Sequence, residues 1–187
     1  MLTKRISEAL ALAVEAHAGQ LRKGTEIPYV SHVMGVASLA LDFGADEDQA
    51  IAALLHDVLE DGGPHFAAVI AEQFGQRVLS IVQGCTDGVP DASGQKADWH
   101  VRKRSYLAHL ADASDDVLLV SGSDKLHNAR AILSDLQTIG PVVWERFSTK
   151  KDGTLWYYRS MVDVFTNRRS PIADQLARTV NEICKLA

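Results

Sequence analysis

The sequence contains few of the residues that mark disulfide-rich, membrane or nucleic-acid-binding proteins. Only two of its 187 residues are cysteines, Cys85 and Cys184, and there is no CxxC pair. This excludes a disulfide framework and a thiolate zinc site and favours a reducing, cytoplasmic location. No apolar run approaches the ~18 residues of a membrane span, so we expect no membrane segment. Lys and Arg do not exceed Asp and Glu, and the formal net charge is −5. Proteins that coat nucleic acids are usually strongly basic, so we expect no bulk nucleic-acid binding.

Alternating β-branched runs are also nearly absent, whereas apolar residues recur at three-and-four spacing along most of the chain. This pattern predicts an all-α fold, a compact bundle of about 8–10 helices in a single domain over 1–187. The expected helices cover 3–19, 31–43, 46–60, 64–73, 75–85, 97–112, 115–134, 151–168 and 171–186, with a short one at 141–147. Ser31 and Asp46 are the predicted caps of the second and third helices, and Gly44 ends the second. The stretches 87–98 and 149–154 are predicted surface loops.

The strongest chemical signal lies at 52–61, where an apolar helix presents four polar side chains. His56 and Asp57 are adjacent, and Glu60 and Asp61 follow one helical turn later. A neutral imidazole beside a carboxylate suits a divalent cation such as Mn²⁺, Fe²⁺ or Zn²⁺. The dipeptide alone is weak evidence, because chance would give about 0.6 His-Asp pairs in a chain of this composition. Glu60 and Asp61 are candidates for the acid and base of a reaction at the ion.

Two further segments offer metal ligands of the right type. His32 lies at the start of the second expected helix, and Asp124 follows the apolar run 117–120. Two histidines and two carboxylates would hold one ion and leave positions for water and substrate. The predicted ligands are His32, His56, Asp57 and Asp124. The remaining histidines are interpreted as partly buried structural residues: His17, His65, His100, His109 and His127.

Two short basic clusters accompany these residues. Arg22 and Lys23 lie on a glycine-bounded segment upstream of His32, and residues 102–104 form the second cluster. Arg22 has the better claim to a function, because a planar guanidinium beside a metal site can stack on a base or clamp a phosphate. Either cluster is also compatible with a solvated face. Residues 24–76 contain no Lys or Arg and nine acidic residues, a charge of −9, and the rest of the chain carries +4. The acidic stretch holds most of the predicted ligands and is therefore a cation-seeking segment.

Several spaced motifs together resemble the HD-type hydrolase domain of the RelA/SpoT-homologue family, and the chain is most similar to a stand-alone small alarmone hydrolase. The matching segments, in order, are 22–23, 28–29, 32, 54–61, 86–87, 102–104 and 124–130. The motif-bearing part covers about 5–165, and a C-terminal helix at 171–186 follows it. The resemblance implies a Mn²⁺-dependent 3′-pyrophosphohydrolase that degrades (p)ppGpp to GDP or GTP and pyrophosphate.

The resemblance also implies roles for individual residues. By motif position, the manganese ligands would be His32, His56, Asp57 and Asp124. Glu60 and Asp61 match the pair that positions and activates water. Arg22 and Lys23 match residues that pack around the base and phosphates, Asn128 one near the ribose, and Tyr157 a tyrosine lining the same pocket.

The chain departs from the family pattern at two places. Val33 replaces a common proline, and Ser121-Gly-Ser123 replaces a stretch such as Lys-Leu-Ala. The missing lysine removes a phosphate contact, and Gly122 is expected to loosen its helix by about 1 kcal/mol relative to Ala. The substrate alternatives are therefore the adenine alarmone ppApp and NADPH at its 2′-phosphate, and a non-catalytic nucleotide sensor is a further alternative. The sequence does not distinguish a monomer from a homodimer.

Overall fold

The computed structural model describes residues 1–87 and 97–187, and these parts of the chain form helices without a named β-strand. The all-α prediction is confirmed, although most of the predicted loop at 87–98 lies outside the described residues. The α-helices are α1 (Arg5–Ala16), α2 (Val30–Asp42), α3 (Glu47–Leu55), α4 (Phe66–Phe74), α5 (Gln76–Cys85), α6 (Trp99–Asp112), α7 (Asp115–Ile139), α8 (Lys150–Asn167) and α9 (Ala173–Leu186). A π-helical turn, η1 (Val58–Gly62), follows α3, and a 3₁₀-helix, η2 (Gly140–Arg146), follows α7.

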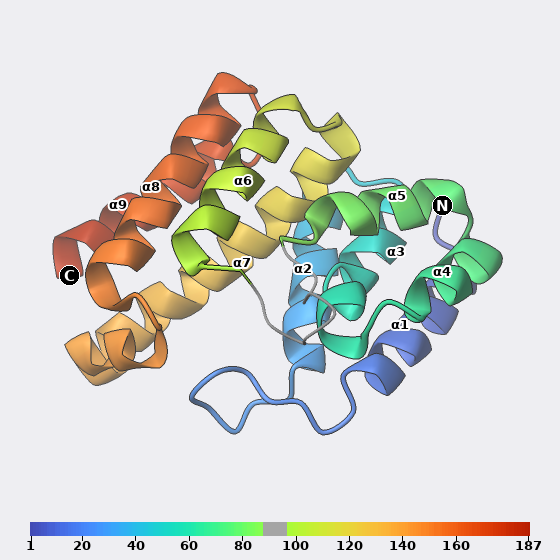
Figure 1. Ribbon diagram of the computed structural model, residues 1–187, viewed down its shortest axis with the longest axis horizontal. Coiled ribbons are helices and arrows are strands. Elements are labelled where there is room, and N and C mark those ends of the chain that lie inside the picture. The colour runs from blue at the N-terminus through green and yellow to red at the C-terminus, as the bar shows by residue number, and fades with distance from the viewer. Residues whose placement is uncertain (88–96) are drawn as a thin grey trace.

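The long helix α7 runs through the middle of the molecule (Figure 1). It packs against α2, α3 and α5 on one side and against α8 and α9 on the other. Residues 117–124 of this helix are buried around the whole circumference, including Ser121, Gly122 and Ser123. A side chain on α7 can therefore meet residues from both the N-terminal and the C-terminal helices.

Local signals explain where α2 and α3 begin and end. The Asp46 side chain accepts a hydrogen bond from the Gln49 backbone N–H, and the Gln49 side chain accepts one from Asp46, which confirms Asp46 as the cap of α3. Gly44 follows α2 with a φ of +88°, a conformation that favours glycine. The prediction that Ser31 caps α2 is wrong. Its backbone N–H already bonds to the Pro28 carbonyl, so it lies within the first turn.

The third helix is shorter than the predicted 46–60. The helix α3 ends at Leu55, and the carbonyl of Asp57 then accepts hydrogen bonds from the backbone N–H groups of both Glu60 and Asp61. The Gly63 N–H bonds to the Val58 carbonyl, five residues back, which produces the wider π-type turn η1. Such turns occur frequently at functional sites.

The helix α7 is longer than the predicted 115–134, because Leu136 is buried and the helix ends only at Ile139, before Gly140. Gly122 does not interrupt it. A Cβ at this position would lie 3.0 Å from Ile172 Cδ1 and 3.2 Å from Phe165 Cε1, so the glycine allows the C-terminal helices to pack closely. The expectation that Gly122 marks a loose helix is therefore replaced by a packing role.

The predicted helix at 151–168 is confirmed as α8, but the overlapping prediction of a surface loop at 149–154 is wrong, because α8 begins at Lys150. Thr154 is buried, and its hydroxyl donates to the Lys150 carbonyl oxygen at 2.7 Å. Burial of Thr154 favours a helix here in spite of the loop-like composition, although Lys150 and Asp152 of the same turn are exposed.

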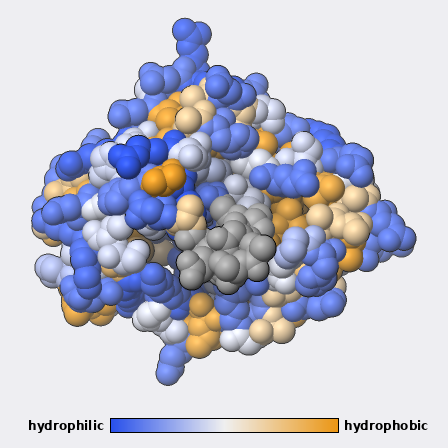
Figure 2. Space-filling view, in the orientation of Figure 1, coloured by the Kyte–Doolittle hydropathy of each residue, from blue (hydrophilic) through white to orange (hydrophobic). Residues whose placement is uncertain are grey.

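The surface in Figure 2 is mostly hydrophilic, with hydrophobic residues in small separate groups. In the described parts of the chain, no helix combines the length and the apolar character needed to cross a bilayer. Cys85 and Cys184 are free thiols.

Candidate active site

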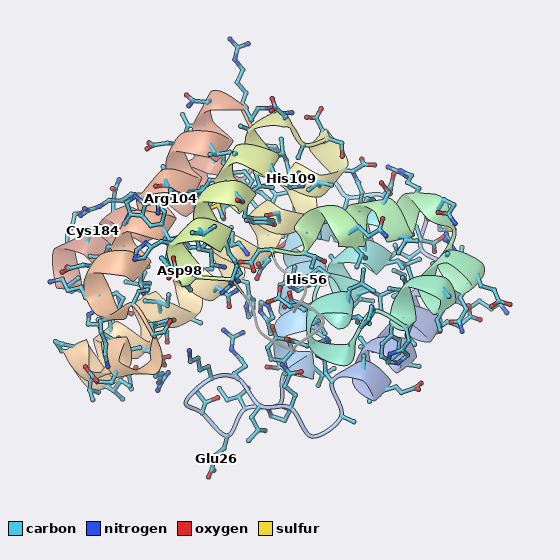
Figure 3. All side chains as sticks on the ribbon, viewed as in Figure 1. Glu26, His56, Asp98, Arg104, His109 and Cys184 are labelled. Carbon is cyan, nitrogen blue, oxygen red and sulfur yellow. The ribbon has the colours of Figure 1, made fainter. Side chains whose placement is uncertain are left out.

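The four predicted metal ligands come together where α3 ends. His32 is on α2, Asp124 is on α7, and His56 and Asp57 lie between α3 and η1. His32 Nε2 lies 3.2 Å from Asp124 Oδ1, and His56 Nε2 lies 3.0 Å from Asp57 Oδ2. The cross distances are 3.8 Å from His32 to Asp57 and 3.7 Å from His56 to Asp124. Ligand atoms of His32, His56 and Asp124 all lie within 4.8 Å of one another. Figure 3 places His56 in the interior of the helical bundle.

The His56 ring turns one nitrogen toward this cluster. Its Nδ1 lies 2.8 Å from the Ala53 carbonyl oxygen, and because a carbonyl only accepts, Nδ1 carries the hydrogen. His56 Nε2 is buried and has no hydrogen-bond partner among the described residues, although two carboxylates lie close to it. A buried nitrogen lone pair between carboxylates fits a divalent cation, so the residues present suit the metal that the sequence implies.

Protons and cations compete for this cluster. Burial alone would lower the pKa of His56, but the negative charges of Asp57 and Asp124 outweigh it and raise that pKa well above its ordinary value. Burial alone would raise the pKa of both carboxyls, but His56 beside Asp57 and Lys125 beside Asp124 hold each pKa below its usual range. The pKa of His32 is lowered, chiefly by burial. A bound cation would replace the proton on His56.

The predicted acid and base, Glu60 and Asp61, lie on η1, directly after two of the ligands. The Asp61 carboxylate accepts a hydrogen bond from Gln20 Nε2 at 2.8 Å. Burial, with the nearby charges of Asp57 and Glu60, raises the pKa of Asp61 despite this hydrogen bond. A carboxyl whose pKa is raised toward neutrality is suited to proton transfer.

Three further residues support the site from the N-terminal side: Tyr29, His17 and Gln20. None of them was given a role in the site from the sequence. The Tyr29 hydroxyl donates to Asp57 Oδ2 at 2.5 Å, and the Tyr29 ring packs on His17 with centroids 4.8 Å apart. His17 Nδ1 lies 2.7 Å from Gln20 Oε1. Because Gln20 Nε2 donates to Asp61, Oε1 accepts from His17. His17 is buried, as predicted, and it also orients the amide that contacts Asp61.

The four predicted substrate-binding residues line a single cavity of about 490 Å³, a size typical of small-molecule sites. They are Arg22, Lys23, Asn128 and Tyr157. The walls also contain side chains to which the sequence analysis gave no role at this site, namely Lys103, Lys125, Arg146, Trp99, Phe147 and Tyr158. Among the described residues, five basic side chains and one carboxylate, Asp135, line the cavity, a net charge of +4 that favours a polyanionic ligand.

Asn128 connects this basic cavity to the metal-ligand cluster. Its Nδ2 donates to Asp124 Oδ1 at 2.6 Å, and its Oδ1 accepts from Arg22 Nη2 at 3.0 Å. Arg22 Nη1 also lies 3.2 Å from Nδ1 of His127, a residue interpreted from sequence as structural. His127 in turn contacts His32, and burial together with the charges of His32 and Arg22 lowers its pKa to about 4.

The second basic cluster, at 102–104, is divided between roles. Arg104 is exposed, whereas Lys103 faces the cavity, pairs with Asp87 and lies 4.8 Å from the centroid of the Tyr157 ring. Arg102 Nη1 bonds to the same Asp87 carboxylate at 2.6 Å. Burial and the charge of Lys125 lower the pKa of Lys103 to about 8.

This chain has a serine at 121 in place of the expected lysine, but Lys125 supplies a positive charge nearby. Ser121 is buried and shares a hydrogen bond of 2.9 Å with the Tyr106 hydroxyl. One helical turn later, Lys125 pairs with Asp124 and lies 5.4 Å from the Tyr106 ring centroid. An ammonium therefore stands beside the metal-ligand cluster in spite of the departure at 121.

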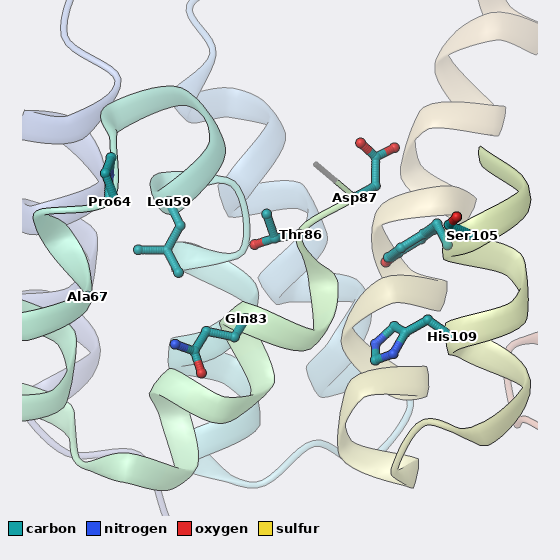
Figure 4. A pocket seen from close by; sticks show the side chains of 9 residues that line it. Leu59, Pro64, Ala67, Gln83, Thr86, Asp87, Ser105 and His109 are labelled. Atoms are coloured by element: carbon teal, nitrogen blue, oxygen red, sulfur yellow. The ribbon is translucent and has the colours of Figure 1, made fainter. Parts of the chain in front are cut away.

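A second cavity, of about 510 Å³, lies between α5, α6 and the η1–α4 connection (Figure 4). It is lined by Leu59, Pro64, Ala67, Gln83, Thr86, Asp87, Ser105, Tyr106 and His109. None of the predicted metal ligands or substrate-binding residues lines it. The candidate active site is therefore the basic cavity and the adjoining cluster.

Comparison with known proteins agrees with this arrangement. A family model described as an HD domain matches residues 9–153. The chain belongs to the HD-domain family. Among HD-domain proteins, it is 35% identical over 163 residues to the guanosine-3′,5′-bis(diphosphate) 3′-pyrophosphohydrolase MESH1 of Drosophila melanogaster, covering 85% of this chain and 83% of that protein. The family resemblance predicted from the motifs is confirmed.

Other relatives of this HD-domain protein are much longer. A probable GTP pyrophosphokinase of Mycobacterium leprae is 33% identical over 68% of this chain but only 16% of its own length. A guanosine-3′,5′-bis(diphosphate) 3′-pyrophosphohydrolase of Haemophilus influenzae is 35% identical over 65% of this chain and 18% of its own. The chain spans less than a fifth of these relatives.

Solved structures share the fold. A metazoan orthologue of SpoT, described as hydrolysing ppGpp, superposes with a TM-score of 0.75 at 28% identity and covers 99% of this chain and 96% of that chain. The Listeria monocytogenes protein lmo0812 gives a TM-score of 0.72 at 26% identity, covering 82% and 99%. The predicted multi-helix HD-domain fold is confirmed.

Proposed function

We propose that this protein is a metal-dependent 3′-pyrophosphohydrolase that converts (p)ppGpp to GDP or GTP and pyrophosphate. The observation that carries the proposal is the junction between the ligand cluster and the basic cavity, which Asn128 makes by bonding to both Asp124 and Arg22. A nucleotide held in the cavity can present its diphosphate to a cation in the cluster. The relatives named as ppGpp hydrolases over most of the chain length support the same activity.

The proposed cofactor is one Mn²⁺ ion, held by His32, His56, Asp57 and Asp124. Imidazole nitrogens with carboxylate oxygens suit this metal and its first-row neighbours. A divalent cation in this place offsets the charge of the diphosphate and lowers the pKa of water.

The side chains of the cavity bind and orient the nucleotide. Arg22 and Lys23 supply cationic contacts to the base and phosphates, and Lys103 and Lys125 add charge near the cluster. Tyr157, with the other aromatic rings of the wall, offers a surface for stacking. Phosphoryl transfer depends mainly on positioning and electrostatic stabilisation, which these groups provide.

Glu60 and Asp61 handle the protons in this proposal. The oxygen of a water molecule forms a bond to the phosphorus attached to the ribose 3′-oxygen, and the bond between that phosphorus and the 3′-oxygen breaks. One carboxylate accepts the proton of the attacking water, and the 3′-oxygen gains a proton as it leaves. A positioned acid or base contributes about 10²- to 10⁴-fold to the rate.

Pyrophosphate release from ppGpp in the presence of Mn²⁺ tests the activity. The wild-type protein and the control His109→Ala, a variant outside the site, should release pyrophosphate. His56→Ala should lose more than ~100-fold in rate. Loss of a residue that hydrogen-bonds to a metal ligand costs about 10- to 100-fold, and loss of the ligand itself costs more. No release by the wild type, or equal rates for wild type and His56→Ala, would refute the proposal.

Two comparisons separate the alternatives. Ranking ppGpp, ppApp and NADPH by kcat/KM identifies the substrate, and a clear preference for NADPH would replace the alarmone with a 2′-phosphate. Glu60→Gln and Asp61→Asn should reduce turnover far more than nucleotide affinity. Equal losses of turnover and affinity would favour a nucleotide sensor. The free thiols of Cys85 and Cys184 support a cytoplasmic location.

A further inference from the structure

His127 lies between a predicted metal ligand and a predicted nucleotide-binding residue, and it contacts both. It is half-buried on α7. Its Nδ1 lies 2.9 Å from His32 Nδ1 and 3.2 Å from Arg22 Nη1, and the two imidazole centroids are 4.9 Å apart. These contacts join residues 95 and 105 positions apart in sequence, so the fold alone creates them.

The backbone of α2 leaves space for the His127 ring at one position. A Cβ on Gly35 would lie 2.3 Å from His127 Nε2 and 2.5 Å from His127 Cδ2. A side chain larger than hydrogen at Gly35 would therefore displace the ring. The ring packs against α2 with its Nδ1 edge turned toward His32 and Arg22.

The direction of the hydrogen bonds follows from the chemistry of Arg22. A guanidinium only donates, so the His127 Nδ1 that it approaches is an acceptor. An accepting His127 Nδ1 requires His32 Nδ1 to donate. With its hydrogen on Nδ1, His32 keeps the lone pair on Nε2, the nitrogen that lies 3.2 Å from Asp124 in the ligand cluster.

We propose that His127 is a positioning residue that holds His32 in its metal-binding tautomer, and that Arg22 sets the direction of this hydrogen bond. The inference rests on the metal site of the proposed function. It means that the affinity for the metal depends on two side chains that do not contact it. It also means that a nucleotide that binds Arg22 would change the hydrogen bond between His127 and His32, and through it the metal-ligand cluster.

The test is Mn²⁺ affinity of the chelator-stripped protein, measured by electron paramagnetic resonance of free Mn²⁺ without any nucleotide. His127→Leu removes the acceptor, and we expect Mn²⁺ binding about 10- to 100-fold weaker, the usual effect of losing an outer-shell partner. His127→Asn has the same branching as Leu but places an amide oxygen where Nδ1 was, so its affinity should stay within about 3-fold of wild type. Arg22→Met should also weaken Mn²⁺ binding.

His109→Leu is the matched control, because this helical histidine donates a hydrogen bond to the Gly84 carbonyl at 3.1 Å and lies at the other cavity. It should bind Mn²⁺ like wild type, and circular dichroism should show that each variant is folded. A folded His127→Leu protein with wild-type affinity, or equal losses in His127→Leu and His127→Asn, would overturn the proposal.

Two outcomes separate this inference from the proposed activity. Wild-type protein that binds Mn²⁺ but releases no pyrophosphate would refute the activity, while a weaker His127→Leu would still support the positioning role. If His127→Leu does not fold, Gly35→Ala gives the answer, because it displaces the His127 ring and should weaken Mn²⁺ binding. Unchanged affinity in Gly35→Ala would overturn the inference.

Discussion

Tyr29 donates a hydrogen bond to Asp57, a predicted metal ligand. The contribution of this hydrogen bond can be measured as a change in the free energy of unfolding of the metal-free protein. The Tyr29 hydroxyl oxygen lies 2.5 Å from Asp57 Oδ2. Tyr29→Phe removes this oxygen and retains the ring, which packs against His17 and His32. A hydrogen bond to a charged group contributes about 1.5–3 kcal/mol, and because the Asp57 side chain is 20% exposed we expect the lower part of this range, about 1.5–2 kcal/mol. At ~2–4 °C per kcal/mol for a chain of this size, the Tm of the metal-free protein should fall by about 3–8 °C.

Tyr157→Phe is the matched control for this prediction. The Tyr157 hydroxyl is buried and has no hydrogen-bond partner among the described residues, so its removal should cost less than about 0.5 kcal/mol. Urea unfolding in the presence of EDTA, followed by circular dichroism, measures both variants. Equal changes in the free energy of unfolding for Tyr29→Phe and Tyr157→Phe would contradict this role of the Tyr29 hydroxyl.

The pH dependence of the Tyr29 effect has a definite sign. The pKa of Asp57 is lowered in the folded protein, mainly by His56 acting against burial. A carboxyl with a depressed pKa stabilises the fold above its ordinary pKa of about 4 and loses that contribution as the pH falls through the folded value. The difference between Tyr29→Phe and wild type should therefore shrink in strong acid.

Three further predictions concern charge in the site. Because the pKa of His56 is raised, its stabilisation of the metal-free protein is complete below about pH 6.5 and is lost as the pH rises through the folded value. The rise in Tm caused by Mn²⁺ should grow over the same range as protons cease to compete, and calorimetry with EDTA or Mn²⁺ checks both signs. Gln20→Leu removes the donor to Asp61, so the acidic limb of the kcat profile should move to higher pH, and an unmoved limb would exclude Asp61 as the base. Because the pKa of Lys103 is about 8, KM for ppGpp should rise above that pH, and Lys103→Arg should abolish the rise; the same pH dependence in both proteins would contradict this.

The helix pattern was predictable because most helices bury one apolar face, and its errors have physical causes. The apolar spacing continues across the end of α3, since Val58 and Leu59 in η1 are buried like Leu55 in α3. Hydrophobic periodicity therefore cannot distinguish the π-type turn from a continued helix. The composition of 149–154 resembles a loop, but Thr154 is buried, and burial is a tertiary property.

The site was predictable to the extent that its chemistry is carried by residue type and order. Few functions other than metal and phosphate binding call for imidazole and carboxylate side chains at this spacing with cationic residues at 22–23. The structure brings these side chains together. The supporting contacts were not predictable. Tyr29 reaches Asp57 across 28 residues, Gln20 reaches Asp61 across 41, and no local pattern records pairs at such separations.

The uneven distribution of charge would let one cavity accept both a cation and a polyanion, as the proposed function requires. Every basic side chain of the cavity wall comes from outside the segment 24–76, which has a charge of −9 and supplies three of the four predicted ligands. Folding places the basic residues at 22–23, 103, 125 and 146 in the wall of the cavity, and Asn128 and Lys125 of the same wall contact Asp124 of the ligand cluster. Asp124, the fourth predicted ligand, comes from α7 and pairs with Lys125 at this boundary. In the proposed mode, a diphosphate is neutralised from two sides, by the basic wall and by the cation, and a short polyanion satisfies both. A long polyanion would also approach exposed carboxylates of the segment 24–76, among them Glu26, Asp42 and Glu72, which repel its charge.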